Sequence, residues 1–161
     1  MVIRKPLKED GSRVWALVKD SGSLDLNSAY CYIMLCEFFK DTCVLVEKEK
    51  ELAGFISAYI LPGEPETLFI WQVAVKSNFR GKGLAKSMIR DILGRGLNNV
   101  RFIKTTVTPS NSASSALFKS IAKELKAECV VENYFPEELF PDKGHEDELL
   151  YTIGPFKVWD I

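Results

Sequence analysis

The stretch from Leu68 to Ala85 constrains the fold more than any other part of the chain. An apolar segment, Leu68 to Val75, leads into a basic, glycine-rich turn, Arg80-Gly81-Lys82-Gly83, and a helical pattern begins at Leu84. Glycines let successive backbone N–H groups converge on one point, and a helix N-terminus adds about half a positive charge there. The sequence therefore predicts an anion site for a phosphate or pyrophosphate.

The spacing of this turn differs from that of the common nucleotide loops, since neither the Walker spacing nor the dinucleotide glycine frame is present. The pattern Arg80-x-x-Gly83-x-Ala85 instead resembles the acyl-CoA pyrophosphate loop of the GNAT family of N-acetyltransferases. The resemblance implies that the main chain of the turn holds the pyrophosphate of acetyl-CoA, at Arg80, Gly81, Lys82, Gly83 and Ala85. The alternative is an ordinary strand-to-helix turn with two solvated cations.

Composition limits the classes of protein that fit. The 161 residues, 47% hydrophobic and 27% charged, suit a single globular domain over 1–161. A net charge of -1 argues against a nucleic-acid partner, because such surfaces need a basic excess. The chain has no apolar run of about 18 residues, so no membrane span is predicted. Residues 1–6 lack the apolar region of a secretory signal. We expect a cytoplasmic protein.

Cysteine and histidine usage predicts no metal. The 4 cysteines, Cys31, Cys36, Cys43 and Cys129, form no CxxC pair, and His145 is the 1 histidine. A structural zinc site needs closely spaced ligand pairs. We expect Cys31, Cys36 and Cys43 to pack as small apolar side chains; a catalytic cysteine is the alternative.

Periodicity predicts strands over 2–4, 42–47, 52–61, 68–75, 102–108, from 129 and over 148–153. Helices are expected over 13–19 (capped by Gly11-Ser12), 28–39, 84–93 and from Asn111 or Ser112. This order predicts an α/β (α+β) fold with a mixed, partly parallel central sheet flanked by helices on both faces. It is also the order of a GNAT fold, in which the fourth and fifth strands splay apart around the pantetheine arm. Another α+β sandwich of similar size is the alternative.

Further segments resemble a narrower group within that family. They are Leu24–Tyr32, Phe69–Val75, Thr105–Asn111 and Gly144–Glu148. All are similar to the L-2,4-diaminobutyrate Nγ-acetyltransferases of ectoine biosynthesis, and the likeness runs from about Val14 to Phe156. The resemblance implies acetyl-CoA as acetyl donor, the γ-amino group of diaminobutyrate as acceptor, and a homodimer.

Acetyl transfer needs an aligned thioester and a donor for the developing oxyanion. We expect that donor to be a backbone N–H of Val73 or Ala74 at a bulge in the central strand, worth about 3 kcal/mol. The resemblance implies that the backbone of Val73 and Val75 pairs with pantetheine and that Asn111 lies near it. Core packing of the valines and helix capping by Asn111 are the alternatives, and both can coexist with cofactor binding.

Substrate ligands are expected in the loop before the second helix and on the central strand. Asp25 lies among apolar neighbours, which favours an ammonium ligand over a helix cap. Ser28 and Tyr30 follow within one turn and could add polar contacts, or serve as cap and core residues. Trp71 could wall the substrate pocket or stack over an ammonium beside the reaction centre, or be an inward-facing core residue.

His145 and Glu146 form the best polar pair for proton handling. An amine with a pKa of about 10 is almost wholly protonated at pH 7, so a side chain or a water chain must take its proton. We expect Glu146 to bind substrate and to act as base, directly or through water, with His145 beside it; a structural role is the alternative for His145. Phe118 stands where many GNAT enzymes have a tyrosine that protonates the CoA thiolate. The sequence therefore leaves a different donor and an unprotonated leaving thiolate both open.

Other functions also fit these residues. A broader acetyltransferase of small diamines or amino acids would share the fold and cofactor, whereas a non-catalytic acyl-CoA-binding module would keep the turn without turnover. A protein N-terminal acetyltransferase would need an open peptide groove, whose width the sequence does not reveal.

Overall fold

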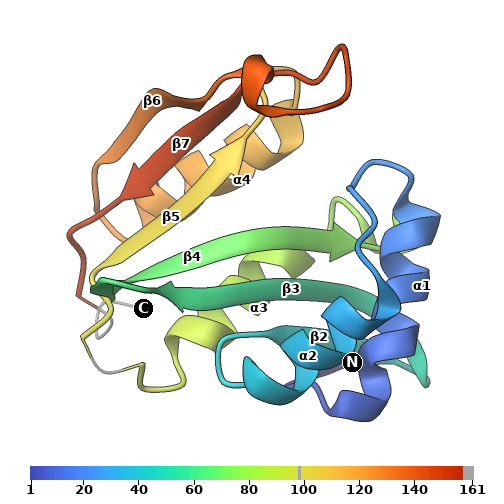
Figure 1. Ribbon diagram of the computed structural model, residues 1–161. Coiled ribbons are helices and arrows are strands. Elements are labelled where there is room, and N and C mark those ends of the chain that lie inside the picture. Colours follow the sequence, from blue (N-terminus) through green and yellow to red (C-terminus); the bar gives the residue numbers. More distant parts are fainter. Residues whose placement is uncertain (98, 158–161) are drawn as a thin grey trace. The chain divides into compact units, whose positions relative to one another are not determined.

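The computed structural model describes residues 1–97 and 99–157 (Figure 1). The helices and strands follow the order β1 (Val2–Arg4), α1 (Gly11–Ser21), α2 (Ala29–Phe38), β2 (Val44–Lys48), β3 (Glu51–Leu61), β4 (Glu64–Val75), α3 (Leu84–Leu93), β5 (Phe102–Val107), α4 (Ser112–Glu124), β6 (Cys129–Phe135) and β7 (Glu148–Ile153). The predicted order is confirmed. Residues 158–161, to which the sequence assigned no role, lie outside the described ranges.

The chain forms two compact units that share strand β4. The first comprises Met1–Ile60 and Ile70 onward through α3, and the second comprises Leu61–Phe69 and the chain from Asn99. The strand order is β1-β2-β3-β4-β5-β7-β6. Thr67–Phe69 of β4 pair in parallel with β5. Antiparallel pairing joins β2 to β1 and β3, and it joins β7 to β5 and β6. The mixed, partly parallel sheet is therefore confirmed; the splay of β4 from β5 stays a prediction.

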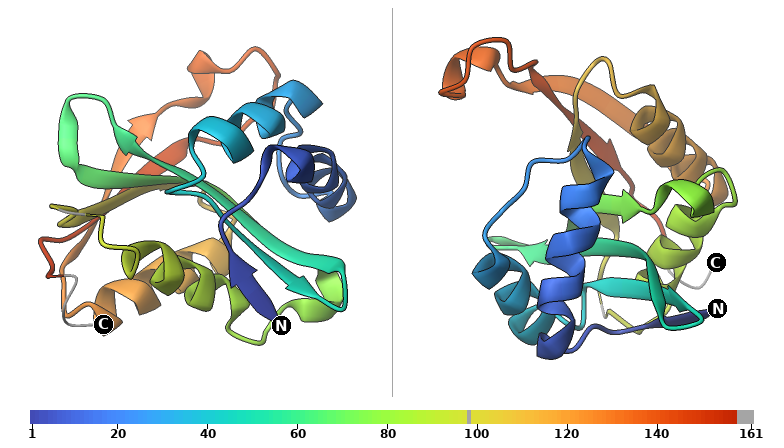
Figure 2. Two further views of the ribbon diagram at one scale, coloured as in Figure 1. Left: turned by 90° about the horizontal axis from the view of Figure 1, so that it is seen from below. Right: turned by 90° about the vertical axis from the view of Figure 1, so that its right-hand side faces the viewer.

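In the first unit, helices cover both faces of the strands. Helices α1 and α2 lie on one face, and α3 lies on the opposite face (Figure 2). The core under α1 and α2 contains Val14, Val18, Tyr32, Cys36, Cys43 and Phe55, each fully buried. Burial raises the pKa of the Cys36 and Cys43 thiols to about 12. These two cysteines thus pack as small apolar residues, as predicted, and their thiols are unreactive at neutral pH.

Helix α1 begins two residues earlier than predicted, and its cap differs. Gly11 is the first helical residue, not a cap. A glycine is required there because α1 and α2 approach closely: a Cβ atom on Gly11 would lie 2.6 Å from Cγ1 of Ile33. Asp10 holds the N-cap position without a side-chain capping bond. Its carboxylate is instead committed to an ion cluster.

That ion cluster joins β1, α1 and β2. The Asp10 side chain is 6% exposed and accepts hydrogen bonds from Arg4 (2.7 and 3.0 Å), from Arg13 (3.0 Å) and from the Leu7 N–H (2.8 Å). Glu47 pairs with both arginines, at 2.9 and 2.7 Å. Burial acts to raise the pKa of Asp10, but the hydrogen bonds and the charges of the arginines outweigh it and lower that pKa.

The second unit places α4 against one face of β5, β7 and β6 (Figure 1). Phe118 and Ile121 of α4 are buried, as are Ile103 of β5 and Ile153 of β7. Strand β6 ends the strand order, and its residues from Val130 to Phe135 are exposed. In the described part of the chain, none of the helices combines the length and apolarity needed to cross a membrane.

The ion cluster predicts an acid-sensitive step in stability. Asp10→Asn should lower the free energy of unfolding at pH 7 by about 2 kcal/mol, less than for a fully buried pair, because Arg4 and Arg13 remain partly in water. Since folding lowers the pKa of Asp10, its stabilisation is complete above the unfolded pKa of about 3.9 and is lost as the pH falls through the folded value. Thermal unfolding at pH 7 and pH 3 checks this. The difference in Tm between the two pH values should be smaller in Asp10→Asn than in the wild type. An equal pH dependence in both proteins would contradict it.

Candidate functional site

The two faces of β4 differ in burial over its second half. Ile70, Gln72 and Ala74 are buried, whereas the alternate residues Trp71, Val73 and Val75 are not. Side chains alternate across a strand, so these three share one face. Trp71 is 42% exposed, so the reading of Trp71 as an inward-facing core residue is wrong. The partly buried valines contribute to packing, and pairing of their backbone with pantetheine stays a prediction.

The turn between β4 and α3 has the backbone of an anion site. Gly81 and Gly83 have φ angles of 72° and 73°, in the left-handed region that other residues avoid. Gly83 caps α3 without a side-chain hydrogen bond, and the Ser87 N–H donates to the Gly83 carbonyl at 3.1 Å. The N–H groups of the first helical turn have no carbonyl partner within their helix. They are therefore available to an anion, with the helix dipole behind them.

The two cations of this turn also hold its shape. Arg80 Nε donates to the Val75 carbonyl at 2.9 Å, and Lys82 Nζ donates to the Asn78 carbonyl at 3.0 Å. Lys82 Nζ also lies 5.7 Å from the ring centroid of Phe79, which is buried. Both side chains are exposed, so the alternative of an ordinary turn with two solvated cations is neither confirmed nor contradicted by these hydrogen bonds.

The loop between α1 and α2 presents the predicted substrate ligands. Ser28 is the N-cap of α2, and its Oγ accepts from the Cys31 N–H at 3.2 Å. Asp25 therefore does not cap α2, and among the described residues no hydrogen bond or ion pair engages its exposed carboxylate. Tyr30 is 69% exposed, so the core alternative for Tyr30 is wrong. Asp25 and Tyr30 are left open to a ligand.

In the second unit, one loop residue holds the predicted base. The Ser110 N–H donates to Glu146 Oε1 at 3.0 Å, and the Ser110 hydroxyl donates to Glu146 Oε2. The next residue, Asn111, caps α4: its Oδ1 accepts from the Ser114 N–H at 3.1 Å. The contact of Ser110 with Glu146 was missed by sequence reasoning, although both residues lie in the segments that carry the family resemblance.

His145 is held by its own loop. Its ring stacks on Phe140 with centroids 3.7 Å apart and 7° between planes, and Nδ1 lies 2.6 Å from the Glu146 carbonyl. The carbonyl only accepts, so Nδ1 carries the proton of this hydrogen bond. Asp147 accepts from the Glu137 N–H at 2.8 Å. His145 therefore has a structural contact, as the alternative proposed, and it also lies beside Glu146 in the chain.

A tyrosine hydroxyl reaches α4 from another element. Phe118, which lies in the region where the resemblance implies a tyrosine, is buried. Tyr151 of β7 donates from its hydroxyl to Ser115 Oγ at 2.9 Å, one helical turn after Asn111. Sequence reasoning considered only the helix and missed this contact.

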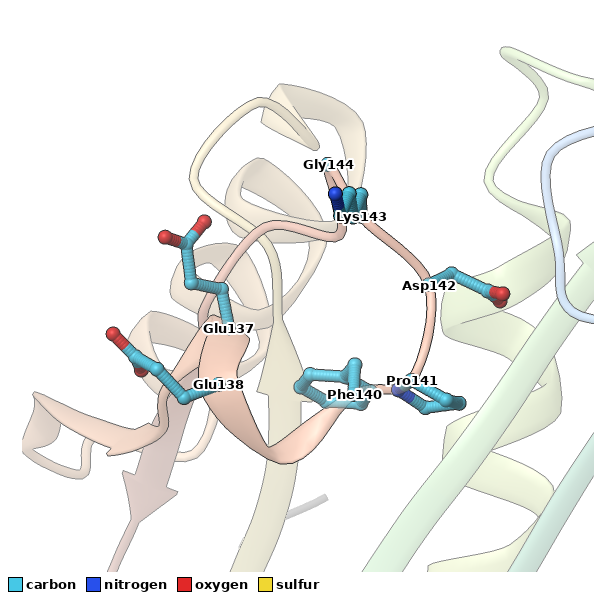
Figure 3. A pocket seen from close by; sticks show the side chains of 7 residues that line it. All are labelled: Glu137, Glu138, Phe140, Pro141, Asp142, Lys143 and Gly144. Atoms are coloured by element: carbon cyan, nitrogen blue, oxygen red, sulfur yellow. The ribbon is translucent and has the colours of Figure 1, made fainter.

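The loop between β6 and β7 encloses a hollow of about 370 Å³ (Figure 3). Its lining comes from that loop alone: Glu137, Glu138, Phe140, Pro141, Asp142, Lys143 and Gly144. None of the residues predicted to bind substrate or cofactor lines it. Within the described ranges, no group of three or more His, Cys, Asp or Glu side chains is arranged to hold a metal ion.

Comparison with known proteins places the chain in a family. Residues 13–122 match the model of the acetyltransferase (GNAT) family. The chain belongs to this family of acetyltransferases. It is 50% identical over 157 residues to the L-2,4-diaminobutyric acid acetyltransferase of Marinococcus halophilus, covering 97% of this chain and 91% of that protein. It is 50% identical over 153 residues to the same enzyme of Virgibacillus pantothenticus, covering 94% and 96%.

Solved structures agree with this placement. The chain resembles the diaminobutyrate acetyltransferase EctA from Paenibacillus lautus, in complex with its substrate L-2,4-diaminobutyric acid and coenzyme A. The TM-score is 0.94 at 50% identity, over 97% of this chain and 95% of that one. Ard1 from Thermoplasma volcanium, at 15% identity and a TM-score of 0.76, shares the fold.

The turn predicts a selective effect on the acyl donor. Arg80→Ala should raise the KM for acetyl-CoA about tenfold, as expected for one charged hydrogen bond, and leave the KM for the amine within about twofold. Arg101→Ala is the matched control, because Arg101 is an exposed arginine paired with Glu66 at 3.7 Å. Steady-state kinetics with each substrate varied in turn measures both values. An unchanged KM for acetyl-CoA would mean that main-chain groups suffice.

Proposed function

We propose that this chain transfers the acetyl group of acetyl-CoA to the γ-amino group of L-2,4-diaminobutyrate, giving Nγ-acetyl-diaminobutyrate for ectoine synthesis. The observation that carries this proposal is 50% identity, over 97% of the chain, to an enzyme whose structure holds diaminobutyrate and coenzyme A. The segments that carry the resemblance also supply the exposed Asp25, the exposed Trp71 and the anchored Glu146.

The acyl donor is assigned to the β4–α3 turn. Its pyrophosphate binds the N–H groups at the start of α3 and the charges of Arg80 and Lys82, with Gly81, Gly83 and Ala85 giving the main chain its approach. Val73 and Val75 supply backbone groups to pantetheine, and the amide nitrogen of Asn111 is not used by its cap. A backbone N–H of Val73 or Ala74 is the proposed oxyanion donor.

The amine substrate carries two ammonium groups and a carboxylate. Asp25 offers a carboxylate that no described residue neutralises. An ammonium group of the substrate supplies the positive charge that pairs with it. The exposed Trp71 ring provides an apolar wall or a face for a cation. Ser28 and Tyr30, at the start of α2, are placed to add polar contacts.

Proton removal is assigned to Glu146. Ser110 donates one hydrogen bond to each of its carboxylate oxygens, and each oxygen keeps a further lone pair. The carboxylate can therefore accept a proton from the substrate ammonium, directly or through a water molecule, while Ser110 holds it in place. His145, packed on Phe140, supports the same loop.

The proposed function is tested by release of free CoA thiol from acetyl-CoA. Diaminobutyrate, ornithine, lysine, putrescine and a short peptide serve as acceptors, and NMR locates the acetyl group. A strong preference for diaminobutyrate with acetyl on the γ-nitrogen is expected. Broad turnover would favour a general diamine acetyltransferase, and CoA binding without turnover would favour a binding module.

The substrate residues predict a loss confined to the amine. Asp25→Asn and Glu146→Gln should each lower kcat/KM for diaminobutyrate roughly 10- to 100-fold, as expected when a charged hydrogen bond is lost, while acetyl-CoA affinity stays nearly intact. Matched controls are Asp20→Asn on α1 and Glu138→Gln in the β6–β7 loop, both exposed acids. Calorimetry of CoA binding separates the two effects. Wild-type kinetics in Asp25→Asn and Glu146→Gln would contradict the assignment.

We also infer that residues 1–161 act as one domain. Strand β4 continues from one unit into the other, which supports this proposal. A cytoplasmic location and the absence of a metal stay predictions of the sequence.

A homodimer is the proposed assembly, and strand β6 supports it. Val130, Val131, Tyr134 and Phe135 on this strand are 40–53% exposed, at the end of the strand order. An exposed apolar edge strand is a template for pairing with another chain, and natural monomers avoid such edges. We assign this edge to a second copy of the chain.

The assembly is tested by light scattering on eluting protein. The wild type should elute at twice the chain mass of 18.2 kDa, and Val131→Lys with Phe135→Lys should elute as the single chain. Val2→Lys is the matched control, because Val2 is an exposed valine on β1 at the other end of the strand order. A dimer that survives the β6 changes would place the interface elsewhere, and a monomeric wild type would contradict the assembly.

A further inference from the structure

A buried glutamine on β4 holds the loop that carries Asp25. Gln72 is 5% exposed, and its side-chain Nε2 donates to the Asp25 backbone carbonyl at 2.7 Å. The Gln72 N–H donates to Ser57 Oγ of β3 at 3.1 Å. The side chain therefore links two places that are 47 residues apart in the sequence, the central strand and the loop before α2.

The other end of the same amide is also occupied. The hydroxyl of Tyr32, which is fully buried in α2, donates to Gln72 Oε1 at 3.0 Å. That hydroxyl in turn receives long contacts from the Asn27 N–H at 3.4 Å and from Asn27 Nδ2 at 3.5 Å. Asp25 and Asn27 are thus both tied to β4 through one amide and one phenol.

The chemistry of these partners leaves the amide one orientation. The Asp25 carbonyl can only accept a hydrogen bond, so it must face the NH2 end of Gln72. The Tyr32 hydroxyl then donates to the oxygen end and keeps its lone pairs for Asn27. Because Gln72 and Tyr32 are buried, a broken contact would leave one of their polar atoms without a partner, and the loop is held against movement.

We propose that Gln72 is a positioning residue that sets the specificity for the amine substrate. It holds the Asp25 loop at a fixed place on β4, the strand to which the proposed function assigns the oxyanion donor. The distance from the ammonium-binding carboxylate to the thioester then selects the length of the diamine. Gln72 and Tyr32 touch no reacting atom; they act through the Asp25 loop. This inference rests on the proposed function in taking Asp25 as the ammonium ligand.

The test separates the two ends of the amide. Gln72→Met removes both contacts, whereas Gln72→Glu keeps the acceptor for Tyr32 and loses the donor to Asp25. Both variants should raise the KM for diaminobutyrate about tenfold, the effect of roughly one buried hydrogen bond, and change the KM for acetyl-CoA less than about twofold. Both should narrow the preference for diaminobutyrate over ornithine in kcat/KM. Tyr32→Phe should shift these values in the same direction, and it tests the inference if Gln72→Met fails to fold.

A matched control and a double-mutant cycle distinguish positioning from general destabilisation. Ser57→Ala removes the partner of the Gln72 main chain and leaves the side-chain amide in place, so the kinetics should stay at wild-type values. In an Asp25→Ala background, Gln72→Met should add no further rise in KM, because the carboxylate whose position it sets is gone. Additive losses in that cycle, equal rises in both KM values, or an unchanged preference over ornithine would each overturn the inference.

Failure of the proposed function gives a different result. If the wild type acetylates another diamine better than diaminobutyrate, the substrate assignment is wrong, and the same cycle is run with that diamine. An Asp25→Ala variant with wild-type KM for that diamine would then overturn the positioning role as well. If Asp25→Ala raises the KM for that diamine and Gln72→Met added to it raises the KM no further, the positioning role is supported.

Discussion

The alternation of side chains along β4 is the constraint on which the site depends. The side chains of Ile70, Gln72 and Ala74 face the interior, so the side chain of Trp71 lies on the opposite face of the strand. A shift of one residue would bury Trp71 and expose the amide that holds the Asp25 loop. The buried face therefore fixes the register of the strand, and the register places the residues assigned to catalysis.

Several residues assigned to ligands also stabilise their own segment. Ser28 and Asn111 cap helices through side-chain oxygens, and Arg80 bonds to the main chain of its own turn. Glu146 is held by Ser110 through both of its oxygens. Hydrogen bonds of this kind, local for Ser28, Asn111 and Arg80 but long-range for Glu146, lock side-chain rotamers before a ligand arrives. This lowers the entropy lost on binding. A structural contact at these positions is therefore compatible with a role in binding.

The sequence was most informative where local rules apply. The helix over 84–93 and the strand over 148–153 were predicted with the bounds that the structure has, because apolar periodicity and glycine mark them clearly. Errors arose where a residue serves a distant contact. Gly11 was taken for a cap, but it allows the close approach of Ile33, and Trp71 could not be assigned to a face from its type alone.

The sequence by itself determined the order of the elements, the glycine-rich turn between β4 and α3 and the family of the chain, because each depends on neighbouring residues. Only the tertiary structure decided which distant polar groups form hydrogen bonds with one another. Gln72 meets Asp25 across 47 residues, and Ser110 meets Glu146 across 36. Gln72 is buried, and its polar atoms must find partners wherever packing brings them. Ser110 and Glu146 are exposed and meet because the fold brings their two loops together. No local pattern records either partner.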